Sequence, residues 1–169
     1  MWWGVSYARL SMHKAYGTVK FTFGLSPPPN RIIFQHRAKD KDTFPDLLDA
    51  TVGGHVELGQ SYEAAALMEA QEETGLILTM ANLIPLTKLC VDSFDTVTGK
   101  YNRCFRQIYG HKFNGNIADL KVEAGQGEGF EAISHAELTQ LNPALVARIC
   151  PSHTRPNYMA IYEQLVALK

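Results

Sequence analysis

The sequence has few cysteines and no long apolar run. Its three cysteines, Cys90, Cys104 and Cys150, are widely separated and form no C-x-x-C pair. Neither a zinc knuckle nor a disulfide framework is therefore predicted. The first ten residues contain no basic segment followed by an apolar stretch, and nowhere do about 18 apolar residues follow one another. We expect a cytoplasmic protein that is not secreted and has no membrane partner.

The sequence also lacks an excess of charge of either sign. Lysine and arginine number 16 against 17 aspartates and glutamates, which gives a net charge of −1. A protein that binds a nucleic-acid polymer needs clustered positive charge to displace counterions, so we expect no such partner. Any anionic ligand would be bound by a local group of bases.

No internal repeat is visible in the sequence. Its length of 169 residues suits one domain, since domains usually have about 100 to 200 residues. We predict a single domain over residues 1–169, in which residues 1–15, with Trp2 and Trp3, form a loosely docked leader. The sequence does not determine the oligomeric state and leaves a homodimer open.

Alternating apolar residues and breaker residues predict both strands and helices. A helix over residues 62–74 is the clearest, because Ser61 is a suitable N-cap and Gly75 a suitable C-terminal stop. Strands and helices do not alternate strictly, so we expect an α/β fold with a mixed sheet flanked by helices. The predicted strands span residues 17–25, 31–34, 47–52, 83–91, 101–113 and 130–133, a Gly-rich loop spans 124–129, and two further helices span 136–141 and 157–168.

Three glutamates share the last turn of the first predicted helix. Glu69, Glu72 and Glu73 are spaced i, i+3 and i+4, which places their carboxylates within about a 100° sector. Like charges at this spacing cost roughly 0.2 to 0.5 kcal/mol each, and acids in a last turn also oppose the helix macrodipole. A hard divalent cation would remove both penalties, because Mg²⁺ binds one or two carboxylates together with water and phosphate oxygens. The turn is typical of half a magnesium site.

The alternative interpretation is that these glutamates are solvated acids on an exposed face. The composition of the helix argues against it, since Leu67, Met68 and four alanines make the helix apolar most of the way round. Such a helix is covered on several sides. Covered helices rarely carry three carboxylates in one patch.

A longer motif surrounds the three glutamates. Gly54 is followed after five residues by Gln60, and after seven more by the run from Met68 to Leu76. Over 23 positions this spacing resembles the Nudix box, the loop-helix-loop signature of the Nudix hydrolases. The resemblance implies a Nudix-type α/β/α sandwich with a mixed β-sheet.

The resemblance also implies an activity and a cofactor. Nudix hydrolases cleave a diphosphate linked to another moiety, with Mg²⁺ or Mn²⁺ held by the glutamates of the box. Carried over to this sequence, Glu69 and Glu73 are the principal metal ligands, and Glu72 is a further ligand or the general base. We expect a small-molecule diphosphate substrate, nucleotide-like or another organic diphosphate.

Two positions depart from the box. It usually has Glu at the position of Gln60 and Arg at the position of Met68, and that arginine pairs with the box glutamates and orients them. The loss of both charges motivates an alternative function, a catalytically weak module of the same fold that binds a nucleotide and reports it to a partner protein.

The segment before the box resembles isopentenyl-diphosphate isomerases and the hydrolases closest to them. The resemblance covers residues 35–45 and continues through Asp49 to Gly53, Gly54 and His55. In the isomerases, the bases aligned with Arg37 and Lys41 contact the substrate diphosphate. We therefore place five residues in the substrate-binding site: Arg37, Lys41, Gly53, Gly54 and His55.

Isomerase activity itself is a weaker hypothesis. Gly53 occupies the position of the catalytic cysteine of the isomerases, and none of the three cysteines is near it in the sequence. His55 aligns with one of their metal-binding histidines, but the predicted strand around Gly17 lacks the partner histidine.

Nudix hydrolases commonly add one more acid from a loop outside the box. Glu123 and Glu128 flank the Gly-rich loop and are both candidates. We choose Glu128 as the additional metal ligand, because residues 128–133 resemble the final strand of the family. The glycines of the loop would let it close on a ligand.

Overall fold

The computed structural model describes residues 17–25, 30–95 and 99–168, so the predicted leader at residues 1–15 lies outside the described residues. In chain order the described elements are β1 (Gly17–Leu25), β2 (Arg31–Arg37), β3 (Leu48–Ala50), β4 (Val52–Val56), α1 (Tyr62–Thr74), η1 (Met80–Asn82), β5 (Ile84–Asp95), β6 (Lys100–Phe113), η2 (Ile117–Asp119), β7 (Gly127–Ser134), α2 (His135–Gln140), α3 (Pro143–Val146), η3 (Pro151–Thr154) and α4 (Pro156–Val166). The three η elements are short 3₁₀-helices.

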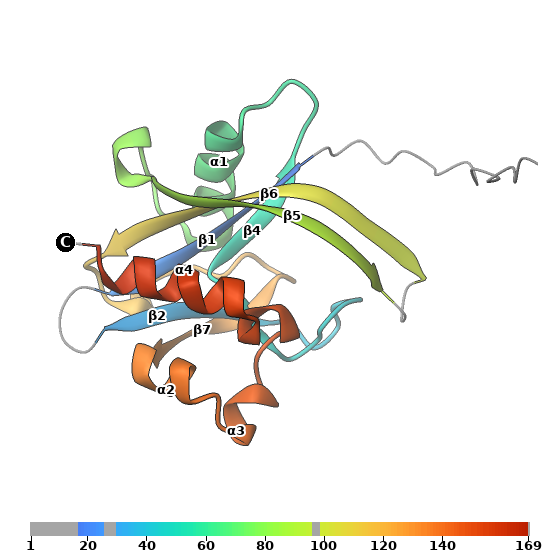
Figure 1. The fold of residues 1–169 in the computed structure, drawn as a ribbon. Coiled ribbons are helices and arrows are strands. Elements are labelled where there is room, and N and C mark those ends of the chain that lie inside the picture. The colour runs from blue at the N-terminus through green and yellow to red at the C-terminus, as the bar shows by residue number, and fades with distance from the viewer. Residues whose placement is uncertain (1–16, 26–29, 96–98, 169) are drawn as a thin grey trace, which may run out of the picture.

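The strands form a mixed sheet that divides around β1. On one edge, β1 pairs in parallel with β6, which pairs antiparallel with β5. On its other edge, residues 17–21 of β1 pair with β4 and residues 23–25 pair with β2. β2 in turn pairs with β3 and β7. Two groups of strands therefore diverge from β1 (Figure 1), and the predicted mixed sheet is confirmed.

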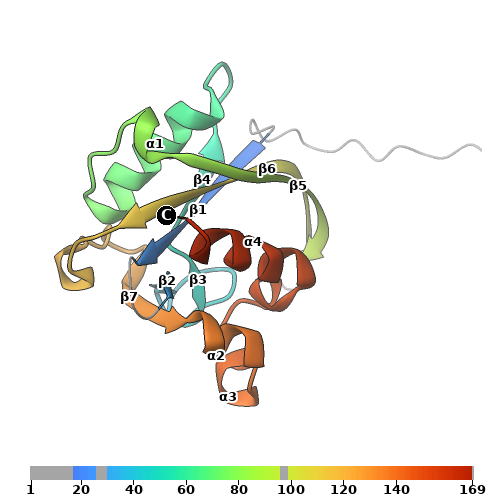
Figure 2. The same ribbon diagram turned by 60° about the vertical axis from the view of Figure 1, so that its left-hand side comes forward.

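Helices cover both faces of the part of the sheet that contains β6. Ile108 and Tyr109 are neighbours in β6 and are both buried, but Tyr109 belongs to the core cluster under α1 and Ile108 to the cluster under α4. This separation follows from the alternation of side chains along a strand. Figures 1 and 2 show α1 and α4 on opposite sides of these strands, which confirms the α/β/α arrangement.

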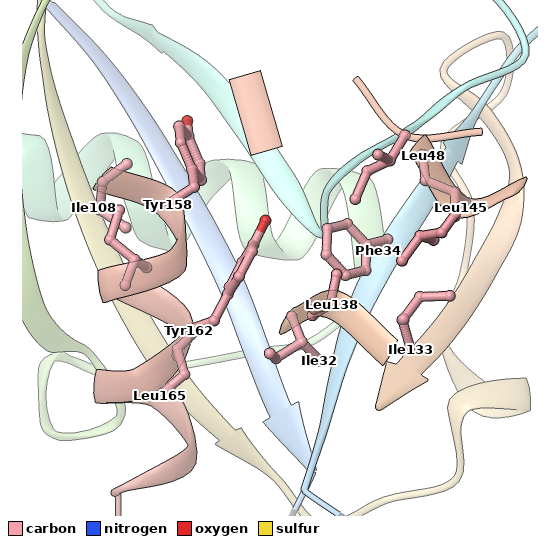
Figure 3. Packing of buried hydrophobic residues seen from close by; sticks show 12 residues of the cluster. Ile32, Phe34, Leu48, Ile108, Ile133, Leu138, Leu145, Tyr158, Tyr162 and Leu165 are labelled. Carbon is pink, nitrogen blue, oxygen red and sulfur yellow. The ribbon is translucent and has the colours of Figure 1, made fainter. Parts of the chain in front are cut away.

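The cluster under α4 is the larger of the two described clusters. Tyr158, Tyr162 and Leu165 extend from α4 toward β2 and β6 and pack with Ile32 and Ile108 (Figure 3). The C-terminal helix is therefore part of the core and closes the face of the sheet opposite α1.

The predicted strand over residues 47–52 is wrong in its extent. β3 ends at Ala50, and a second strand, β4, continues from Val52 through Gly53 and Gly54 to Val56. The glycine pair does not end the strand, because β4 pairs with β1 along one edge. Along its other edge the Gly53 N–H donates to a side-chain carboxylate, that of Glu73.

The predicted Gly-rich loop is also shorter than expected. β7 begins at Gly127 and pairs with β2 next to a bulge between His36 and Arg37. A Cβ at Gly127 would lie 2.7 Å from the carbonyl oxygen of His36. Glycine at this position allows two strands to approach, so only residues 124–126 of the predicted loop remain outside the strand.

Candidate active site

Helix α1 places the three glutamates as the sequence predicts. The Ser61 hydroxyl accepts the Ala64 N–H at 3.1 Å and begins the helix. Gly75 ends it in the left-handed conformation with φ of 73°. Both termini are set by local hydrogen bonding and by the freedom of glycine at positive φ. The acidic turn therefore lies at the C-terminal end of a helix that packs on β4 and β1.

Glu73 is a buried carboxylate held by the backbone of β4. Its Oε2 accepts the Gly53 N–H at 3.0 Å, and its exposed fraction is only 7%. Burial raises its pKa to about 8, and the charges of Glu69, Glu123 and Asp49 act in the same direction. The Gly53 hydrogen bond opposes the shift because it stabilises the ionised form.

Glu69 lies directly over Gly54. A Cβ on Gly54 would be 1.8 Å from Glu69 Oε1 and 2.0 Å from Cδ, so only glycine leaves room for the carboxylate. Burial raises the pKa of Glu69, and the charges of Glu72 and Glu123 raise it further. The sequence predicts that Gly54 lies in the substrate-binding site. The group that approaches Gly54 is a side chain of the same protein.

The two candidate acids outside the box lie in different surroundings. Glu123 is half-buried and its charge raises the pKa of both Glu69 and Glu73. Its segment is fastened to α1, since the Lys121 N–H donates to the Thr74 carbonyl at 3.0 Å. Glu128 is exposed on β7, and it is not among the causes of either pKa shift.

The acid cluster suits an open cation site. Among the described residues, no three His, Cys, Asp or Glu side chains form a group that could by itself hold a metal ion. Mg²⁺ does not require one, because it usually keeps several waters and takes one or two protein carboxylates together with substrate phosphates. Glu69 and Glu73 supply such oxygen donors, and burial, together with neighbouring carboxylates, raises the pKa of both. The residues present therefore fit a hard divalent cation.

Arg37 and Lys41 are both bonded within the chain. The Arg37 guanidinium donates to the carbonyl oxygens of Thr43 and Phe44 at 2.8 to 3.2 Å and contacts Asp49 Oδ2 at 3.3 Å. Lys41 donates to the side-chain oxygen of Gln126. The structure thus gives Arg37 a definite role in holding the loop that carries Lys41.

The remaining predicted residues lie on β4 and in the last turn of α1. Gly53 and His55 are exposed on β4, and Glu72 is exposed on α1. Gln60 and Met68, which depart from the box, contact one another, with 3.8 Å between Gln60 Nε2 and Met68 Sδ. The amide of Gln60 and the thioether of Met68 are thus in contact at the two positions where the box usually has Glu and Arg.

Sequence reasoning missed a buried polar group next to this site. His153 in η3 is fully buried and is hydrogen-bonded to Asp49 in β3 and to Tyr162 in α4. A lone histidine in a short segment carries no periodic signal, and its partner Asp49 is 104 positions away in the sequence. Only the folded chain brings these residues together.

One known family matches this chain. The NUDIX domain family matches residues 21–150, which is most of the chain. The chain belongs to this family. The match confirms the prediction made from the glutamate spacing, whereas the isomerase-like subgroup stays a prediction.

Individual relatives share part of the sequence or the whole fold. An uncharacterized Nudix hydrolase from Nostoc sp. is 48% identical over 46 residues, which are 27% of this chain and 27% of the relative. The NUDIX domain of Shewanella oneidensis NrtR, solved with ADP ribose, has a TM-score of 0.64 at 14% identity and covers 95% of this chain and 94% of its own. The E. coli dihydroneopterin triphosphate pyrophosphohydrolase has a TM-score of 0.63 at 16% identity, over 91% of this chain and 97% of its own.

The sequence relatives and the solved structures support different conclusions. The chain matches only 25% to 37% of the length of the curated relatives, and the solved structures show the fold alone. In the part of the chain that the structure describes, no helix is long and apolar enough to cross a membrane.

Proposed function

We propose that this Nudix domain hydrolyses a diphosphate linkage in a small, nucleotide-like metabolite with Mg²⁺ or Mn²⁺. The observation that carries the proposal is the pair of carboxylates held on two glycines of β4. Glu69 occupies the space that a side chain at Gly54 would fill, and Glu73 accepts the Gly53 N–H. Two half-buried or buried acids in contact with a backbone, and close to a third at Glu123, favour a bound cation.

Each acid has a distinct part in the proposed reaction. Glu69 and Glu73 would hold the metal, since their positions are fixed by β4. Glu72 is exposed next to them and would act as a further ligand or take the proton from an attacking water molecule. When bound, the cation would supply neutralisation of negative charge on the phosphate oxygens.

The loop between β2 and β3 is the proposed substrate contact. Lys41 has three N–H donors, of which Gln126 takes one, so its ammonium group keeps donors for a phosphate. Arg37 would act mainly by holding the loop through Thr43 and Phe44. The names of two similar structures, a triphosphate pyrophosphohydrolase and a complex with ADP ribose, support a nucleotide-like substrate.

The experiment is a substrate panel with a matched variant. Purified protein is incubated with Mg²⁺ or Mn²⁺ and nucleoside triphosphates, dinucleotides, ADP-ribose, nucleotide sugars and prenyl diphosphates. Release of phosphate, diphosphate or nucleotide from at least one compound is expected, with loss of that activity in Glu73→Gln. Absence of any product from the whole panel would refute the proposal.

The contact between Gln60 and Met68 supports one alternative. Without an arginine at position 68, the box glutamates lack the partner that orients them in the family, which favours a domain that binds a nucleotide without turnover. Calorimetry with ADP-ribose separates the two functions. Tight binding with no hydrolysis, unchanged in the double variant Met68→Arg with Gln60→Glu, would establish the binding module.

A cytoplasmic location and a homodimer stay predictions.

A further inference from the structure

Asp49 is the centre of a polar network that the proposed reaction does not use. Its Oδ1 is 2.8 Å from His153 Nε2 and also accepts the Ala50 N–H at 2.8 Å. Its Oδ2 is 3.3 Å from Arg37 Nη1. Both carboxylate oxygens are therefore engaged by donors within the protein, which makes Asp49 an orienting group and a poor metal ligand.

The positions of the protons in this network follow from the chemistry of its members. An ionised carboxylate only accepts hydrogen bonds, so His153 Nε2 carries a proton and donates to Asp49. His153 Nδ1 is 2.6 Å from the Tyr162 hydroxyl. Burial raises the pKa of Tyr162 well above its usual value, so the hydroxyl keeps its proton and lies within hydrogen-bond distance of Nδ1.

The network joins segments that are distant in the sequence. Tyr162 belongs to α4, which packs over the core (Figure 3), while His153 belongs to η3 and Asp49 to β3. Through Arg37 the network reaches the carbonyl groups of Thr43 and Phe44 in the loop that carries Lys41.

The network also reaches the glutamates. Asp49 precedes Gly53, which binds Glu73, by only four residues, and β3 leads into β4 through a single residue. The charge of Asp49 is one of those that act on Glu73. A shift of Asp49 would therefore move both the strand that holds Glu73 and the loop that holds Lys41.

We propose that Asp49 and His153 are positioning residues. They fix the positions of the β4 glycines and of the Lys41 loop relative to the glutamates of α1. The proposal rests on the proposed function and assigns the C-terminal segment a part in it. A role in packing alone would not explain the arrangement, because apolar side chains of the same volume often replace buried polar groups without loss of stability.

The test compares two substitutions at one buried position. His153→Phe keeps a ring but removes the donor to Asp49, whereas His153→Gln keeps an N–H close to the position of Nε2. Three quantities are measured below the unfolding temperature of each variant: the affinity for Mn²⁺ alone by electron paramagnetic resonance, amide hydrogen exchange in residues 38–47, and kcat and KM for a compound cleaved in the panel. Asp49→Asn serves as a second variant if His153→Phe does not fold.

The proposal requires a graded result. His153→Phe should weaken Mn²⁺ affinity and lower kcat by about 10- to 100-fold, the usual effect of losing a group that orients metal ligands, while His153→Gln stays within about threefold of the wild type. Exchange in residues 38–47 should be faster in His153→Phe only. Wild-type values in a folded His153→Phe, or equal damage in both variants, would overturn the proposal.

The two proposals fail in different ways. A wild-type protein that cleaves nothing in the panel contradicts the proposed hydrolase. Mn²⁺ affinity and amide exchange still decide whether Asp49 and His153 position the site, because neither measurement depends on turnover.

Discussion

The carboxylate of Glu69 occupies the place where a side chain at Gly54 would project. The calculated Cβ position lies 1.8 Å from Oε1 and 2.5 Å from Cγ of Glu69, far inside any non-bonded contact. Gly54 lies within a strand and pairs with β1. Gly54 is therefore required because the Glu69 carboxylate occupies the space next to it on the face of β4.

Replacement of Gly54 by alanine should separate activity from stability. The methyl group would displace the far end of a flexible side chain, which is cheap for the fold, but Glu69 would lose its place beside Glu73. We expect hydrolysis to fall by about 10- to 100-fold, comparable to the loss of an orienting contact, with a change in unfolding free energy below about 1 kcal/mol. Steady-state kinetics and urea denaturation measure the two effects.

Gly99→Ala is the matched control for this substitution. Gly99 has φ of 67° and nothing within 4 Å of an added Cβ, so alanine there introduces backbone strain without a clash. Stability should fall by about 1 kcal/mol, with turnover unchanged. If Gly54→Ala behaved like this control, Glu69 would not depend on Gly54.

The pKa of Glu73 predicts how stability depends on pH in the absence of metal. The folded protein holds this proton up to about pH 8, compared with an ordinary value of 4.5. The stabilisation by protonated Glu73 is therefore complete below pH 4.5 and is lost as pH rises to about 8. Relative to Glu73→Gln, the wild-type free energy of unfolding should fall by at most about 1.4 kcal/mol per pH unit in that window.

Urea denaturation in a chelator at pH 5, 6, 7 and 8 measures this difference. Mg²⁺ should reduce the fall in the free energy of unfolding. Its effect should be larger at pH 8 than at pH 5, because the cation competes with the proton for the same oxygens. A difference between wild type and Glu73→Gln that does not change with pH would show that the carboxyl is ionised throughout.

Glu123 and Glu128 offer a paired test of the additional acid. Glu123 acts electrostatically on both Glu69 and Glu73, whereas Glu128 is exposed. Glu123→Gln should weaken the affinity for Mn²⁺ by about 10-fold, and Glu128→Gln should change it less than twofold. Titration of Mn²⁺ followed by electron paramagnetic resonance gives both values. The reverse order would return the role to Glu128, the residue chosen from the sequence.

The double variant Met68→Arg with Gln60→Glu tests whether the departures from the motif limit turnover. Met68 is 37% exposed, so the longer side chain fits without disturbing the core. The guanidinium should orient the neighbouring carboxylates, as bidentate pairs do, and raise kcat by about 3- to 10-fold. Phe94→Arg on β5, 50% exposed, controls for an arginine added elsewhere on the surface. Equal rates in the double variant and the wild type would mean that the site does not need the arginine.

The features predicted correctly from the sequence are those encoded locally. Helix α1 has the predicted bounds because Ser61 and Gly75 satisfy its ends through neighbouring residues. The three glutamates follow from the helix period alone. The family resemblance then supplied the fold class, although no local rule specifies that β1 pairs in parallel with β6.

The features predicted incorrectly depend on contacts between distant segments. The predicted strand over residues 47–52 stops before Gly53 and Gly54, but pairing with the distant strand β1 makes both glycines part of β4. The contacts of Arg37 with the carbonyl groups of its own loop and with Asp49 also depend on the fold, and its part in substrate binding stays a prediction. In each case the decisive partner comes from another element.

The fastening of Lys121 to the end of α1 has an evolutionary consequence. The Lys121 N–H donates to the Thr74 carbonyl, and the Lys121 side chain lies against Gly75. The chain therefore leaves the site at residue 75 and returns to it at residue 120, with the β5–β6 hairpin as an excursion between. Insertions and deletions in that hairpin that keep β6 paired with β1 would leave the spacing of Glu73 and Glu123 unchanged. Selection is thus free to vary the exposed surface of that hairpin while the acid cluster is inherited intact.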